Sequence, residues 1–195
     1  MKLKSIAVFC ASSFGNKPIY QEAAVYVGRV FAQRQIRLVY GGGKVGLMGA
    51  IADAVMADDG LVIGVIPDFL NSKEIGHTGV SQLIVVDTMH ERKRIMNELC
   101  EGIIALPGGF GTMEELFEML TWGQLGLHPK PIGLLNTDGF YDQLINFIQH
   151  MVDSGLLREE NQAMLLIGDT IEELLEKMEN YVAPAVPKWL NKQST

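Results

Sequence analysis

The chain alternates short apolar runs with longer stretches in which apolar residues recur every three or four positions. The short runs have the length of buried strands and cover residues 6–10, 38–40, 61–66, 83–86, 103–106 and 132–135. The longer stretches have helical periodicity and cover residues 20–34, 47–57, 88–100, 112–125, 141–154 and 170–181. The pattern therefore predicts strands and helices in regular alternation.

Such alternation predicts an α/β fold, a doubly wound and mostly parallel sheet with helices on both faces. Of the 195 residues 48% are hydrophobic, which is enough for one core, so we expect a single domain over residues 1–182. Pro184 and Pro187 follow the last helical stretch and predict an extended tail over residues 183–195. Ligands of doubly wound folds bind beyond the carboxyl ends of the strands, which are followed here by the loops 11–17, 41–49, 67–79 and 107–112.

The composition limits the partners of this domain. Aspartate and glutamate number 23 against 16 lysines and arginines, a formal net charge of −7. Nucleic acids and many membrane surfaces are anionic, so this charge argues against both as partners, and an anionic ligand would need a local site. The two cysteines, Cys10 and Cys100, predict free thiols in a reducing environment, and we therefore expect a cytoplasmic protein.

A glycine-rich segment stands between the apolar run at 103–106 and the helical stretch that follows it. It reads Pro-Gly-Gly-Phe-Gly-Thr-Met-Glu-Glu over residues 107–115. Glycines let the backbone approach an anion closely, and a helix that begins near Thr112 would direct its N–H groups to the same place. The segment therefore predicts a phosphate-sized site.

Glu115 lies in the first turn of that expected helix and allows two interpretations. A carboxylate beside an anion site indicates a ligand that needs a base or a stabiliser of positive charge. Alternatively, Thr112 and Glu115 form a capping box, in which the glutamate accepts the N–H of the cap residue. The apolar positions 113, 116, 117 and 120 predict the core face of this helix and place Glu115 off it.

The preceding helical stretch carries three adjacent cations, Arg92, Lys93 and Arg94. Arg92 precedes the apolar positions 95, 96 and 99 by three, four and seven residues, so it shares their inward face. A buried arginine needs an anionic partner, for which Glu115 and a ligand phosphate are the candidates. Lys93 lies at the border of that face, whereas Arg94 shares a polar face and is expected in solvent.

A second glycine cluster follows the strand expected at 38–40. Gly41, Gly43 and Gly46 match the dinucleotide-binding pattern G-x-G-x-x-G, and Asp68 follows the next strand, where a ribose-binding acid could stand. Tight turns and close helix packing explain the same glycines equally well. Both interpretations stay open from the sequence.

The sequence offers a few more polar contacts for a ligand but no motif for a metal ion. Gly42, Gly43 and Ser12 are candidates for contacting a phosphate or a sugar. The four histidines have no metal-ligand spacing, and the two cysteines form no C-x-x-C motif. We therefore expect neither a metal ion nor a cofactor.

Three of these segments together resemble the LOG ("Lonely Guy") family. They are P-G-G-x-G-T-x-x-E at 107–115, the preceding M-x-x-R-K at 89–93, and the glycine run at 41–49. Further matching stretches lie at 122–126, 130–136 and 138–141, so the resemblance covers nearly the whole chain.

The resemblance implies a Rossmann-like homodimer that cleaves the N-glycosidic bond of cytokinin riboside 5′-monophosphates, giving the free base and ribose 5-phosphate, with AMP as a further candidate substrate. Matching the motifs position by position implies that Arg92 and Glu115 form the catalytic pair. It also implies substrate contacts from Glu74, Lys93, Gly109, Phe110, Gly111, Thr112, Met113, Glu114 and Thr121. This activity suits the residues, because the reaction develops positive charge on the ribose and a carboxylate stabilises it.

Two alternatives of other classes use the same glycine loops. One is a noncatalytic carrier or sensor that binds a purine nucleotide without turnover. The other is an NAD-dependent oxidoreductase built on Gly41, Gly43 and Gly46, for which no proton-transfer residue stands out. The label lysine decarboxylase, often given to members of this family, would require a lysine Schiff base with pyridoxal phosphate, which no segment indicates.

Overall fold

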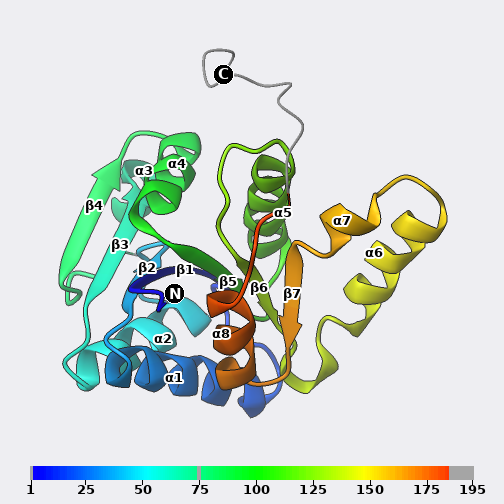
Figure 1. Cartoon of the computed structure of the whole chain (residues 1–195). Coiled ribbons are helices and arrows are strands. Elements are labelled where there is room, and N and C mark those ends of the chain that lie inside the picture. Colours follow the sequence, from blue (N-terminus) through cyan, green and yellow to red (C-terminus); the bar gives the residue numbers. More distant parts are fainter. Residues whose placement is uncertain (1, 74–75, 185–195) are drawn as a thin grey trace.

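The computed structural model describes residues 2–73 and 76–184, which form one parallel sheet between two layers of helices (Figure 1). The strand order is β4-β3-β2-β1-β5-β6-β7, and each neighbouring pair is parallel. The strands are β1 (Ser5–Phe9), β2 (Arg37–Tyr40), β3 (Val62–Pro67), β4 (Gln82–Val86), β5 (Gly102–Ala105), β6 (Ile132–Leu135) and β7 (Leu165–Gly168). The predicted doubly wound α/β fold is confirmed.

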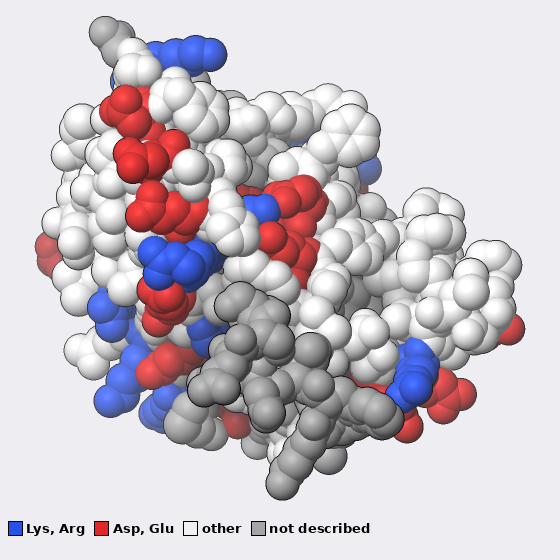
Figure 2. All heavy atoms as spheres, turned by 90° about the horizontal axis from the view of Figure 1, so that it is seen from above, with Lys and Arg blue, Asp and Glu red and all other residues white. Residues whose placement is uncertain are grey.

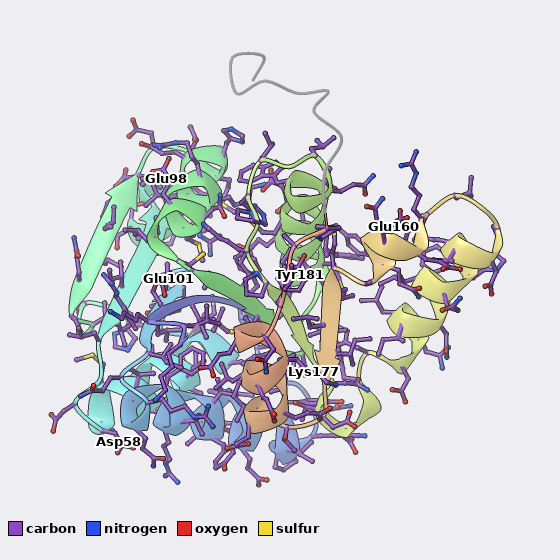
Figure 3. All side chains as sticks on the ribbon, in the orientation of Figure 1. Asp58, Glu98, Glu101, Glu160, Lys177 and Tyr181 are labelled. Carbon is purple, nitrogen blue, oxygen red and sulfur yellow. The ribbon has the colours of Figure 1, made fainter. Side chains whose placement is uncertain are left out.

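Helices cover both faces of this sheet, and the sheet separates two apolar clusters, one on each face. One cluster joins the sheet to α1 (Pro18–Gln33), α2 (Gly46–Ala57) and α8 (Ile171–Glu179). The other joins it to α4 (Met89–Leu99), α5 (Phe110–Gln124) and α6 (Asp142–Asp153). Three short elements, α3 (Asp68–Asn71), η1 (Thr137–Gly139) and α7 (Glu159–Gln162), lie in the connections. Charged side chains such as Asp58, Glu98 and Glu160 stand at the periphery (Figure 3).

All six predicted strands and all six predicted helices are present with small shifts at their ends, and one strand was missed. Helix α1 begins at Pro18, two residues before the predicted start, because proline suits the first turn of a helix. Strand β7 was not predicted, since the apolar run at 164–167 is short and directly precedes a helical stretch. The tail beyond residue 184 lies outside the described residues, as does Glu74.

The strand order brings two of the expected ligand loops together. The chain builds the sheet outward from β1 through β2, β3 and β4, and then returns to place β5 on the other side of β1. At this reversal the N–H of Ala11 donates to the carbonyl oxygen of Pro107 at 3.2 Å. The loops after β1 and β5 therefore border one crevice, the usual ligand position of such sheets.

His128 fixes the turn between α5 and β6 in its neutral form. The residue is buried, its Nε2 lies 3.1 Å from the carbonyl oxygen of Met119, and its Nδ1 accepts the N–H of Lys130 at 3.2 Å. Nδ1 is therefore unprotonated and Nε2 carries the hydrogen. Burial, together with the charge of Lys130, lowers the pKa of His128 to about 4.

We predict that His128 makes folding acid-sensitive. The unfolded histidine binds a proton below its ordinary pKa of 6.5, whereas the folded one does so only near pH 4, so stability falls as the pH drops between these values. His128→Asn keeps an acceptor for the N–H of Lys130 but does not titrate. Urea unfolding at pH 7 and pH 4.5 should show a loss on the order of 2 kcal/mol in wild type that the variant lacks. Equal losses in both proteins would contradict this role.

Candidate functional site

The loop from β5 to α5 presents unpaired backbone donors. Helix α5 begins at Phe110 with Gly109 as its N-cap, and the N–H of Met113 donates to the carbonyl oxygen of Gly109 at 3.0 Å. Within the described residues, the N–H groups of Phe110, Gly111 and Thr112 have no acceptor. Apart from the adjoining residues and the backbone of α5 itself, no heavy atom lies within 4 Å of a Cβ built on Gly109 or Gly111, so this helix end is open to a ligand. A free helix N-terminus of this kind binds anions.

The predicted start of this helix was wrong by two residues, and with it the capping box. Thr112 is already the third residue of α5 and is buried, so it does not cap the helix. A Cβ on Gly108 would lie 2.0 Å from Oγ1 of Thr112, which shows that the loop folds tightly over the threonine. Glu115 is therefore free of the capping role that the sequence allowed.

The prediction that Glu115 lies off the core face is also wrong. Its exposed fraction is 7%, because this side of α5 faces α4 instead of solvent. Burial raises the pKa of the Glu115 carboxyl, the nearby Arg92 guanidinium opposes this shift, and Glu114 adds to it. Glu115 is thus a buried acid whose ionisation depends on its neighbours.

Arg92 is the partner of Glu115, as its position on the inward face of α4 predicted. The side chain is buried, and Nη1 lies 3.3 Å from Oε1 of Glu115. On the opposite side, Nε donates to the carbonyl oxygen of Val65 in β3 at 3.1 Å. The guanidinium therefore bridges the third strand and α5.

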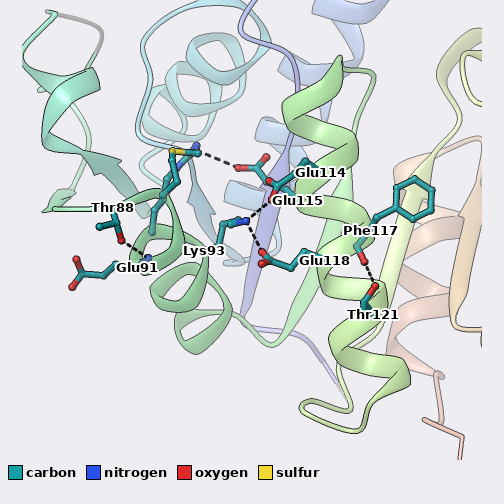
Figure 4. Close-up of polar contacts among 10 residues, drawn as sticks. Thr88, Glu91, Lys93, Glu114, Glu115, Phe117, Glu118 and Thr121 are labelled. Atoms are coloured by element: carbon teal, nitrogen blue, oxygen red, sulfur yellow. Dashed lines mark hydrogen bonds and ion pairs between the residues drawn. The ribbon is translucent and has the colours of Figure 1, made fainter. Parts of the chain in front are cut away.

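Lys93 forms a second link between α4 and α5 (Figure 4). Its buried ammonium pairs with Glu114 and, at 2.9 Å, with Oε2 of Glu118. Burial lowers the pKa of Lys93, but the hydrogen bonds to the two carboxylates outweigh it and the net shift is upward. Arg94 pairs with Glu98 at 2.7 Å on the exposed side of α4, as predicted.

The sequence interpretation missed Glu118, although its spacing from Glu114 and Glu115 could have indicated it. These three carboxylates face only two cations, Arg92 and Lys93, so the cluster carries one excess negative charge when all five are ionised. Figure 2 shows acidic side chains gathered around a cation on the face that α4 and α5 form. The cluster therefore favours a partner that carries or develops positive charge, and an anion would have to lie toward the α5 N-terminus.

The other glycine loop is closed by backbone packing. The N–H groups of Leu47 and Met48, in the first turn of α2, both donate to the carbonyl oxygen of Ala11, at 3.1 and 3.4 Å. Gly46 has a φ of +59°, and a Cβ there would lie 2.3 Å from backbone atoms of Ser12 and Ser13. The alternative of tight turns and close packing therefore accounts for this match to the dinucleotide pattern.

Several predicted contact residues lie around these loops. The carbonyl oxygen of Gly42 accepts the N–H of His77, and Gly43 forms an isolated bridge with Gly76. A pocket of about 220 Å³ lies between the loops after β1 and β5 and is lined by Ser13, Gly108 and Gly109, with Tyr20 and Phe140 among its aromatic residues. Ser12 is exposed next to it.

Two predicted residues are not brought to the Arg92–Glu115 pair within this chain. Thr121 is exposed further along α5, and its hydroxyl donates to the carbonyl oxygen of Phe117 at 2.7 Å (Figure 4). Asp68 is exposed in the first turn of α3. Among the described residues, no group of three or more histidine, cysteine or acidic side chains could hold a metal ion, and no helix is long and apolar enough to cross a membrane.

Comparisons with known proteins agree on one family. A family model described as "Possible lysine decarboxylase" matches residues 48–178. The chain is 46% identical to cytokinin riboside 5′-monophosphate phosphoribohydrolase LOG2 of Arabidopsis thaliana, over 93% of this chain and 85% of the relative. It is also 46% identical to the probable enzyme of that name, LOGL2, of Oryza sativa subsp. japonica, over 92% of this chain and 74% of the relative.

A solved structure confirms the fold at a greater distance. The molybdenum cofactor binding protein of Rippkaea orientalis superposes with a TM-score of 0.67 at 22% identity, covering 92% of this chain and 97% of that one. At this identity the likeness concerns the fold alone.

We predict that the two glycine loops respond oppositely to an added methyl group. Gly46→Ala should lower the free energy of unfolding by more than about 2 kcal/mol, because its φ is positive and backbone atoms occupy the space. Gly111→Ala should leave stability unchanged or raise it by about 0.5–1 kcal/mol, since the position is helical and open. Urea unfolding of both variants measures the contrast. A Gly46→Ala protein as stable as wild type would mean that this loop, too, is open.

Proposed function

This chain belongs to the LOG family, and on that premise we propose that it is a nucleotide phosphoribohydrolase. Its substrates would be cytokinin riboside 5′-monophosphates, with AMP as a second candidate, and its products the free base and ribose 5-phosphate. The observation that carries the proposal is the buried Arg92–Glu115 pair beside the open N-terminus of α5. The helix N-terminus suits the 5′-phosphate of a nucleoside monophosphate, and the carboxylate suits the ribose at which the bond breaks.

The N-terminus of α5 would hold the 5′-phosphate. The N–H groups of Phe110, Gly111 and Thr112 supply donors, and the helix dipole adds partial positive charge. Binding the phosphate there fixes the ribose relative to Glu115, which lies one turn further along the same helix. The excess negative charge around Lys93 keeps the phosphate at the helix end.

Glu115 would act on the ribose as the glycosidic bond breaks. The C1′–N bond cleaves with its electron pair leaving on the base, positive charge develops on the ribose, water adds to C1′, and the proton that water loses ends on the base. An ionised Glu115 stabilises that charge or accepts the proton of the water. Arg92 favours the ionised carboxylate against the effect of burial and orients it.

The remaining contacts that the resemblance implies belong to this proposal. Lys93 and Glu114 would contribute to the acidic cluster beside the substrate, and Met113 would contact the substrate from the first turn of α5. Ser12, Gly42 and Gly43 would border the substrate, while Glu74 lies outside the described residues. Lys93 is held by two carboxylates, which gives no support for a lysine Schiff base.

We also propose a homodimer, located in the cytoplasm. Phe117 of α5 and Leu125, the residue after its end, are exposed on the stripe that includes Thr121, and Phe110 at the start of the helix is 97% exposed. A second copy packed on this stripe would cover these apolar side chains and bring Thr121 near a neighbouring site. Cys10 and Cys100 are both free and buried, which suits a reducing compartment.

We predict that isopentenyladenosine 5′-monophosphate is hydrolysed to free base and ribose 5-phosphate. Glu115→Gln and Arg92→Ala should each lower kcat by at least about 100-fold while the far-ultraviolet circular dichroism stays native. Chromatographic detection of the base, with AMP assayed in parallel, ranks the two substrates. Nucleotide binding without turnover in wild type would favour the carrier or sensor, and full activity of Glu115→Gln would remove Glu115 from the mechanism.

We predict a molar mass of about 43 kDa in solution, twice the 21.5 kDa of one chain, by light scattering coupled to size exclusion. Phe117→Glu should shift the protein toward monomer, because a carboxylate would be buried in the interface. Phe147→Glu is the matched control, since Phe147 is also exposed but lies on α6. A monomeric wild type, or equal effects of the two variants, would contradict the proposed interface.

A further inference from the structure

Gly41 stands directly against the guanidinium of Arg92. It follows β2, and a Cβ built on it would lie 1.8 Å from Nη2 and 3.0 Å from Cζ of Arg92. Carbon and nitrogen atoms that are not bonded cannot approach within 1.8 Å. Any side chain at position 41 and the present position of the guanidinium therefore exclude each other.

The backbone gives no other reason for glycine at this position. Gly42 and Gly46, in the same loop, have positive φ values of +74° and +59° and are glycines for conformational reasons. Gly41 is not among the residues of positive φ, so the left-handed strain that excludes other residues at positions 42 and 46 does not apply to it. Position 41 requires glycine because the guanidinium of Arg92 occupies the space that a side chain would need.

The guanidinium also has little freedom to move aside. Its Nε is bound to the carbonyl oxygen of Val65, its Nη1 faces Glu115, and Sδ of Met48 would lie 3.3 Å from the added carbon. A methyl group at position 41 would push Nη2 while these contacts hold the other nitrogens. The least costly response is to rotate the guanidinium out of its contact with Glu115.

We propose that Gly41 is a positioning residue of the active site, whose missing side chain leaves the space in which Arg92 meets Glu115. This inference rests on the proposed function for its kinetic consequences. It assigns Gly41 to the hydrolytic site, whereas the sequence pattern had suggested a dinucleotide phosphate contact. Arg92 carries the effect, and Gly41 need not touch the substrate.

Displacing Arg92 would change the ionisation of Glu115. The charged and titratable groups that face this carboxyl are Arg92 and Lys93 from α4, Glu114 and Glu118 from α5, and Cys10 at the end of β1. Arg92 is the largest influence that lowers the pKa of Glu115. Moving it away would raise that pKa, so the acid limb of the activity profile would move to higher pH.

The kinetic test compares Gly41→Ala with wild type in kcat against pH, using isopentenyladenosine 5′-monophosphate. We expect kcat to fall by about 100-fold, the loss typical of a displacement near 1 Å, and the acid limb to move to higher pH. Gly102→Ala is the control, because Gly102 begins β5, at the end of the strand opposite the loop that leads to α5, and its new methyl group would meet the flexible ends of Met178 and Leu3 and no atom of Arg92. It should keep the kcat and the acid limb of wild type.

Unchanged kcat in Gly41→Ala would overturn the proposal. A lower kcat with an unmoved acid limb would do so as well, because that combination indicates a general disturbance of the fold. Only the joint change identifies the displacement of Arg92 from Glu115.

A thermodynamic cycle tests the same contact without any activity. Gly41→Ala should lower the melting temperature in wild type but not in the Arg92→Ala background, where the methyl group enters vacated space. Equal losses in both backgrounds would refute the proposal. If Gly41→Ala does not fold, a folded double variant supports it and an unfolded one contradicts it. An inactive wild type would refute the proposed function, while this cycle would still decide the role of Gly41.

Discussion

A guanidinium cannot be removed from water without acceptors and countercharge, and much of this site follows from that constraint on Arg92. One face of the side chain is satisfied by a carbonyl oxygen of β3 and the other by Glu115. Meeting both conditions requires α4, α5 and the third strand to stand at fixed distances from one another. The contacts of Arg92 with β3 and with Glu115 therefore fix the spacing of these elements.

The alternation of apolar runs and helical stretches was sufficient to predict the sheet and both helical layers, because period and length are local properties of the sequence. The inward position of Arg92 was predictable for the same reason, since spacing along one helix fixes its face. The burial of Glu115 was not, because it depends on α4 packing beside α5. The residues of α5 alone predict that this face is polar and exposed. It is buried because α4, which carries the complementary charges, covers it.

The two glycine loops illustrate the same limit. Both follow a strand and open a helix, and nothing local separates them. In one, the carbonyl oxygen of Ala11 occupies the first-turn donors of α2, whereas in the other the donors of α5 stay open. Ala11 lies in the loop after β1, more than thirty residues before α2, so only the tertiary structure distinguishes the closed loop from the open one.

The central position of β1 also governs when the site can form. Ile6 pairs with Gly102, so the two strands that flank the crevice are separated by 96 residues of chain. Closing such a loop costs conformational entropy before any contact compensates for it, and folds with distant pairings fold slowly. A chain still emerging from the ribosome has β1 through β4 before β5 and α5 can dock beside β1. The open N-terminus of α5 therefore reaches its place beside the loop after β1 only when β5 docks, so any ligand held between these two loops would bind the completely folded chain and not a partly folded one.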